Sequence, residues 1–120
     1  MIDIPRSFQA THQTAGLPGF PAVDVFGSPH ELVRAQFWGT VQRLAGRTVA
    51  MGGRPGGAYG LSLYVRNAAT GDVRYLTHFH ELALKVGDAV KPGTILGTIA
   101  DSAVSGKPGT SHVHYGLKRG

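Results

Sequence analysis

The chain contains no cysteine among its 120 residues. It therefore has no disulfide framework, and it offers neither a thiolate nucleophile nor a thiolate metal ligand. Any metal site must be built from histidine, aspartate or glutamate side chains.

Long apolar runs are also missing. No run approaches the ~20 residues that a membrane-spanning helix needs. The first six residues lack the basic and apolar regions of a signal peptide. We therefore expect no transmembrane segment. The lack of a signal peptide favours a protein that is carried on a particle, exported by another route or cut from a longer chain.

Acidic residues are few compared with basic ones. Seven Asp and Glu residues face twelve Lys and Arg residues, which gives a formal charge of +5 and a pI near 10.0. This surplus favours an anionic partner such as nucleic acid, a cell-wall polymer or a membrane surface, although solubility alone would explain it. No basic and aromatic platform or helix motif supports nucleic acid, so we expect no nucleic-acid partner.

Turn-forming residues are abundant, with 18 glycines and seven prolines. Between them, apolar and polar residues alternate, and no window has a helical pattern. The length fits one compact domain, which we predict to be all-β. The predicted strands are 22–26, 31–35, 37–44, 59–66, 73–80 and a last one beginning at 111. The predicted irregular segments are an arm over 1–21, a turn over 67–72 and loops over 45–58 and 101–110.

Two histidines stand two residues apart near the end of the chain. In a strand, His112 and His114 would point to one face and Val113 to the other. Neighbouring imidazoles can divide the work, one binding a metal and the other handling a proton or an oxyanion. His78 and His80 share a face of strand 73–80 in the same way. An isolated pair of this kind is more often a chance feature of a solvated face.

Asp24 lies in a predicted strand between two valines. Aspartate is depleted in strands, so a partner is needed to explain it. A metal ion, a turn contact or an exposed face would each do so. His12 in the arm and His30 in a turn are most simply exposed.

The order of these motifs is more specific than any one of them. Thr-His-Phe at 77–79 is followed by Val-Gly-Asp-Ala-Val-Lys-Pro-Gly at 86–93, Leu-Gly-Thr at 96–98 and Ser-His-Val-His at 111–114. The series resembles the lysostaphin-like (LytM-type) zinc metallopeptidases, which cleave peptide cross-links of bacterial cell walls, and it runs from about Gly19 to Lys118. Biotinyl and lipoyl carrier domains share part of the pattern, but this chain lacks their lysine on a tight hairpin.

The resemblance implies an antiparallel sheet groove of the barrel-sandwich-hybrid type, with residues 1–18 as an arm and 19–120 as the peptidase domain. It implies Zn²⁺ bound by Asp24 and His114, and catalytic roles for His78 and His112. Peptidoglycan peptides would be the substrate. The protein would act outside the cell, at the wall or on a virion.

One position departs from the family pattern. The family has a metal-binding histidine four residues before the aspartate, where this chain has Phe20. Either His12 reaches in from the arm as the replacement ligand, or the site is degenerate. In the second case the domain is a cell-wall-binding or structural module, for instance of a phage tail. His80 has a weaker claim to the vacant ligand position. We adopt the enzyme with His12 as the leading hypothesis.

Two glycine-containing loops, 52–57 and 101–110, are predicted to wall the groove. Arg47 and Arg54 flank the first loop. These arginines would attract an anionic cell wall.

Overall fold

A computed structural model of the chain describes residues 1–4, 22–47, 60–100 and 111–118. These residues form nine strands and no helix, which confirms the all-β prediction. No helix in the described ranges is long and apolar enough to cross a membrane. The strands are β1 (Ile2–Ile4), β2 (Ala22–Phe26), β3 (Leu32–Ala35), β4 (Gly39–Arg47), β5 (Gly60–Arg66), β6 (Val73–Leu82), β7 (Ala89–Val90), β8 (Ile95–Ile99) and β9 (His112–Lys118).

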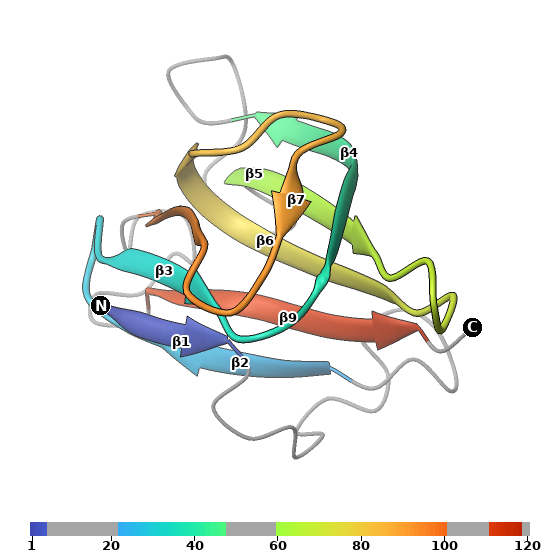
Figure 1. Cartoon of the computed structure of the whole chain (residues 1–120). Coiled ribbons are helices and arrows are strands. Elements are labelled where there is room, and N and C mark those ends of the chain that lie inside the picture. The colour runs from blue at the N-terminus through green and yellow to red at the C-terminus, as the bar shows by residue number, and fades with distance from the viewer. Residues whose placement is uncertain (5–21, 48–59, 101–110, 119–120) are drawn as a thin grey trace.

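The strands form one sheet in the order β1-β3-β8-β6-β5-β4-β7. β9 pairs with both β6 and β2, so the sheet branches at β6. Figure 1 shows β2, β9, β6, β5 and β4 stacked one above the other, with β7 passing in front of them. All pairings are antiparallel except that of β1 with β3. The predicted antiparallel sheet is thus confirmed, with one parallel pair added.

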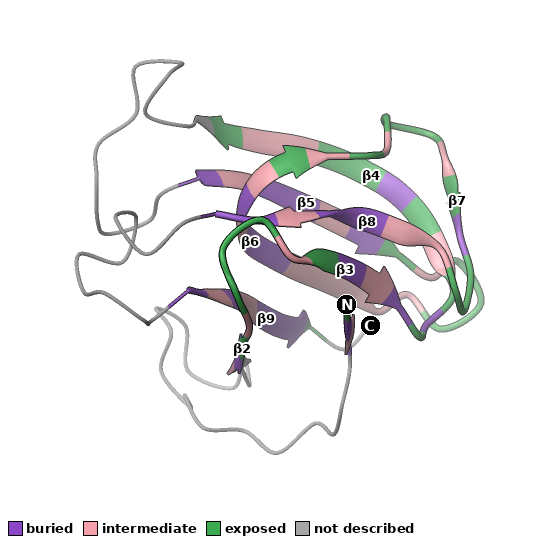
Figure 2. Cartoon of the chain, turned by 90° about the vertical axis from the view of Figure 1, so that its left-hand side faces the viewer, coloured by how far each residue is buried: buried purple, intermediate pink, exposed green. Residues whose placement is uncertain are grey.

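The hydrophobic core lies against one face of these strands. In Figure 2 the buried residues are concentrated in β5, β6, β8 and β9, whereas the connecting turns are mostly exposed. On β5, the buried Leu63 and Val65 flank a half-buried Tyr64, as expected for a strand with one face in the core. The opposite face of the sheet is therefore left for polar and aromatic side chains.

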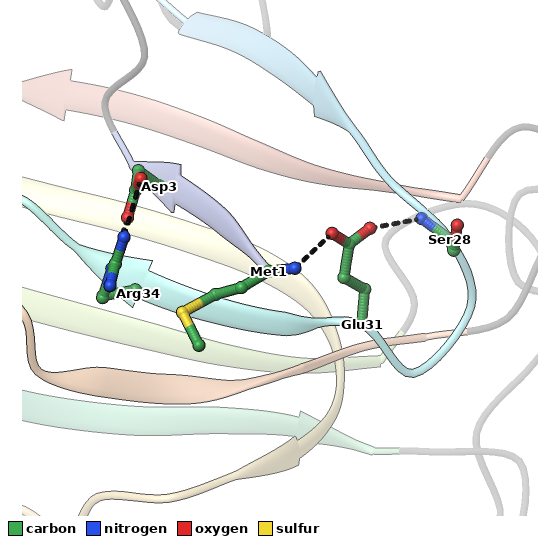
Figure 3. Close-up of polar contacts among 5 residues, drawn as sticks. All are labelled: Met1, Asp3, Ser28, Glu31 and Arg34. Atoms are coloured by element: carbon green, nitrogen blue, oxygen red, sulfur yellow. Dashed lines mark hydrogen bonds and ion pairs between the residues drawn. The ribbon is translucent and has the colours of Figure 1, made fainter.

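The N-terminal residues depart from the prediction of an irregular arm, which is wrong for residues 2–4. Ile2 and Ile4 are only 2% and 0% exposed and belong to the core. Between them, Asp3 accepts a hydrogen bond of 2.6 Å from Arg34 of β3 (Figure 3). This bond raises the pKa of Arg34. The prediction missed β1 because three residues are too few for a visible alternation.

The turn after β2 is held by Glu31. Its carboxylate accepts a 2.8 Å hydrogen bond from the backbone N–H of Ser28 and lies 2.8 Å from the amino group of Met1 (Figure 3). A residue with a side chain would clash at position 27, because its Cβ would come within 2.6 Å of Ile99, so glycine is suited to this turn. The turn thereby fixes the end of the strand that carries Asp24.

The predicted loop over 45–58 is wrong for residues 45–47, which continue β4. Gly46 has a φ of 88° and lies so close to β5 that a Cβ would come within 2.2 Å of the Gly60 carbonyl oxygen. The glycine at 46 therefore permits close strand pairing, whereas the sequence pattern had indicated a loop. β6 extends to Leu82, two residues beyond the predicted strand 73–80, and the strand predicted to begin at 111 is β9, which ends at Lys118.

Several predicted features lie outside the described residues. These are His12, Phe20, Arg54 and the loops 52–57 and 101–110. The division at residue 18 between arm and domain also falls there. These interpretations remain predictions.

Candidate active site

The pairing of β2 with β9 brings Asp24 and His114 together. The two residues are directly opposite in the antiparallel register. His114 Nδ1 lies 3.1 Å from Asp24 Oδ1, within hydrogen-bonding distance. Both side chains are largely buried, with 17% and 19% exposed. The expectation that Asp24 needs a partner is met by one of the predicted histidines.

His112 lies beside this pair. It is opposite Phe26 in the register, and the two rings are 5.4 Å apart. Its Nε2 is 3.8 Å from Asp24 Oδ1. Val25 and Val113 point into the core. The alternation predicted for these two strands therefore holds, and one face carries Asp24 together with both histidines.

His78 reaches the same place through an irregularity in β6. Its φ is 76°, and the register between β5 and β6 shifts beside it. The extra residue lets Leu76 and Phe79 both enter the core although they are three positions apart. The ring of His78 then lies 4.8 Å from that of His112 and 6.4 Å from that of His114. Strict alternation over 77–80 was therefore a wrong prediction, yet His78 joins the predicted cluster.

His80 takes a different direction. A second register shift, between β6 and β8, falls between Phe79 and Glu81. The ring of His80 stacks on that of His30 at 4.1 Å and an angle of 18°. His78 therefore contacts the cluster, whereas the ring contact of His80 is with His30. His30 is exposed, as predicted.

A buried hydroxyl pair lies next to the cluster. Ser62 and Thr77 are 7% and 4% exposed, and their hydroxyl oxygens are 2.7 Å apart. Thr77 is the register partner of His114. The pair satisfies both hydroxyls and supports the strand that carries the histidine. The sequence analysis did not identify it.

The distance between the Asp24 and His114 donor atoms can be compared with the coordination geometry of a metal ion. Zinc–ligand bonds of 2.0–2.2 Å in a tetrahedral site place neighbouring donor atoms about 3.3–3.6 Å apart. The 3.1 Å between Asp24 Oδ1 and His114 Nδ1 is the length of a hydrogen bond, and a small separation of the two atoms would bring it into this range. Within the ranges that the structure describes, however, no three His, Asp or Glu side chains are grouped to hold a metal. Among the described His, Asp and Glu side chains, Asp24 and His114 are the two potential donors that lie closest together.

Aromatic rings continue from the histidines across the sheet. Tyr75 of β6 lies 6.2 Å from His114, and Tyr64 of β5 lies 4.9 Å from Tyr75. The guanidinium of Arg43 on β4 is 5.1 Å from the centre of the Tyr64 ring. The sequence analysis missed this row. The pairing of the two tyrosines could have been predicted from the turn at 67–72, because extending the hairpin from that turn brings Tyr64 opposite Tyr75.

We compared the sequence and the fold with those of known proteins. No protein-family model and no curated protein matches the sequence. Among solved structures, lysostaphin matches with a TM-score of 0.62 and 22% identity over 82% of this chain. A mutant catalytic domain of the prophage-encoded M23 protein EnpA from Enterococcus faecalis matches with a TM-score of 0.63 and 24% identity over 88% of this chain and 74% of its own. Pseudoalterin, a deep-sea M23 metalloprotease, matches with a TM-score of 0.59 and 22% identity over 92% of this chain and 61% of its own.

The chain has the lysostaphin-like fold. This confirms the resemblance drawn from the motif order. The match covers 36% of the length of lysostaphin itself, so this lysostaphin-like domain corresponds to about a third of that protein.

Proposed function

We propose that this domain is a metal-dependent endopeptidase that cleaves peptide cross-links of bacterial peptidoglycan. The observation that carries the proposal is the convergence of Asp24, His78, His112 and His114 on one face of a lysostaphin-like sheet. The four residues come from three distant parts of the sequence, which strand pairing and a bulge bring together. Pseudoalterin, which has a similar fold, is an M23 metalloprotease.

Zinc is the metal that suits this donor set, because carboxylate oxygen and imidazole nitrogen are among its usual ligands. Asp24 and His114 would hold it, and we propose His12 as the third ligand because Phe20 has no donor atom. When bound, zinc polarises a carbonyl group and lowers the pKa of a bound water towards about 7.

His78 and His112 would handle protons and charge. In this proposal neither His78 nor His112 binds the metal, so the ring nitrogens of both remain available for the reaction. A neutral imidazole accepts a proton from the attacking water, and an imidazole N–H stabilises the oxyanion of the tetrahedral intermediate. The two rings are 4.8 Å apart, so both could act on the same substrate carbonyl.

Hydrolysis of purified cell walls tests the proposal. The protein, supplied with one equivalent of zinc, should release new amino groups from the wall peptides. Asp24→Ala should abolish release, while His30→Ala, which alters a histidine outside the cluster, should retain it. If the wild-type protein binds one equivalent of zinc but releases no amino groups from walls of several bacteria, the proposed activity is wrong.

A second function is favoured by Phe20 and by the lack of a three-ligand group in the described ranges. The domain would then bind the wall without cutting it. Wall binding without zinc and without hydrolysis would identify this case. The comparisons provide no support for a place in a phage tail.

A further inference from the structure

The row of rings beyond His114 crosses the sheet at right angles to its strands. Tyr75 and Tyr64 are register partners on β6 and β5, and Tyr64 and Arg43 are register partners on β5 and β4. Neighbouring strands are about 4.8 Å apart, so Arg43 lies two spacings, or about 10 Å, from Tyr75. That distance corresponds to about three residues of an extended peptide.

The position of Arg43 depends on an irregularity of β4. The register with β5 shifts between Val41 and Arg43, which adds Gln42 to this strand. A bulge of this kind redirects the following side chain. It places the guanidinium of Arg43 over the Tyr64 ring. Stacking of this type restrains an arginine while leaving its N–H donors at the ring's edge available.

Arg43 differs from two other arginines of the sheet. Arg34 is bound to Asp3, and Arg74 donates a 2.9 Å hydrogen bond to the Tyr115 hydroxyl. Arg43 is exposed and, within the described part of the chain, makes no ion pair. A restrained guanidinium without a protein carboxylate is suited to receive a carboxylate from a ligand, because its planar fork matches both oxygens.

We propose that Arg43, Tyr64 and Tyr75 form a substrate subsite that binds a free carboxylate carried by the wall peptide. The inference rests on the proposed function and adds a specificity determinant to it. The tyrosine rings contact the peptide between the reacting bond and the carboxylate. Arg43 donates two parallel N–H hydrogen bonds to the carboxylate.

A matched pair of peptides tests this subsite. The probes are the tetrapeptide amide L-alanyl-γ-D-glutamyl-L-lysyl-D-alanine amide with the glutamyl α-carboxyl either free or amidated. By calorimetry, the wild-type protein should bind the free acid at least about tenfold more tightly, the ratio expected for hydrogen bonds to a charged group. Arg43→Gln should bind both peptides alike.

Two further variants separate a specific site from general charge attraction. Lys91→Gln removes the same charge from an exposed turn and should retain the preference. Arg43→Lys keeps the charge but loses the fork and the stacking geometry, so it should lose most of the preference. The proposal would be overturned if Arg43→Gln and Lys91→Gln retained the preference for the free acid equally. It would also be overturned if the wild type bound the two peptides equally or bound neither.

The wall-hydrolysis assay keeps the two proposals distinguishable. If the wild type cleaves walls but shows no preference between the peptides, the subsite is wrong and the proposed activity stands. If the preference exists and is lost in Arg43→Gln while walls are not cleaved, the subsite serves a binding domain and the proposed activity is wrong.

Discussion

His112 and His114 are two residues apart, yet the structure gives them different relations to Asp24. His114 Nδ1 is 3.1 Å from the carboxylate oxygen, within hydrogen-bonding distance. His112 Nε2 is 3.8 Å from the same oxygen, and its ring also contacts those of His78 and Phe26. These relations fit the proposed division of roles, in which His114 would be the ligand and His112 would act on the substrate.

This difference yields a prediction for two single variants. His114→Ala should lose bound zinc, because it removes one of the two proposed donors in the described part of the chain. His112→Ala should retain zinc and the fold but lose wall hydrolysis. Elemental analysis after dialysis against zinc, together with the hydrolysis assay, checks both. Loss of zinc in His112→Ala would mean that the two roles are exchanged.

A second prediction concerns the buried hydroxyl pair. Thr77→Val leaves the Ser62 hydroxyl buried without its partner, which should lower the free energy of unfolding by about 1–3 kcal/mol. The double variant Ser62→Ala/Thr77→Val removes both hydroxyls. Its loss in free energy of unfolding should be smaller than the sum of the losses in Ser62→Ala and Thr77→Val. Urea unfolding of the four proteins measures the coupling. Simple additivity would show that the 2.7 Å contact contributes nothing.

At the scale of strands, alternation predicted most of what the structure contains. Strand 22–26 was predicted with the observed limits, and the faces of Asp24 and His114 followed from it. Alternation could not reveal the bulges of β4 and β6, because a bulge changes the direction of a side chain without changing the residue pattern. That is why the stacking of His80 on His30 and the Arg43–Tyr64 contact were missed. Pairing of β1 with β3 is a tertiary contact between residues about thirty positions apart, which no local pattern contains.

Close pairing of β6 with β8 gives a prediction at the same scale. A Cβ on Gly97 would lie 2.1 Å from the backbone carbonyl oxygen of Glu81. Gly97→Ala should therefore push the strands apart and lower the free energy of unfolding by about 3 kcal/mol or more. Gly93→Ala is the control, since a Cβ there meets open space and only its φ of 96° is unfavourable. It should cost about 1–2 kcal/mol. Equal losses in thermal unfolding would contradict the proposed strand contact.

For the whole molecule, the surplus of basic residues predicts how the domain meets a cell wall. With a formal charge of +5, attraction to an anionic wall is partly long-range and is screened over about 8 Å at physiological ionic strength. Binding to purified walls should persist in Asp24→Ala and weaken as salt rises. It should also weaken in the double variant Arg47→Ala/Arg54→Ala.

Co-sedimentation with walls at several salt concentrations measures this effect. Lys85→Ala/Lys91→Ala removes the same charge elsewhere and serves as the control for the two arginines. If the wild type fails to sediment with any of several Gram-positive and Gram-negative walls at low salt, the wall-directed function is wrong in both proposed forms.

The pairing of β2 with β9 also determines when the cluster can exist during folding. Asp24 and His114 are 90 positions apart, so the contact closes a loop that contains most of the chain. Closing such a loop loses much chain entropy, and sheets dominated by distant pairings form slowly. The hairpin of β5 and β6 can form early from neighbouring residues, and it already contains His78. The contact between Asp24 and His114 forms only when β9 joins β2. A nascent or half-folded chain therefore lacks the complete cluster, and the proposed activity should appear only with the completed sheet.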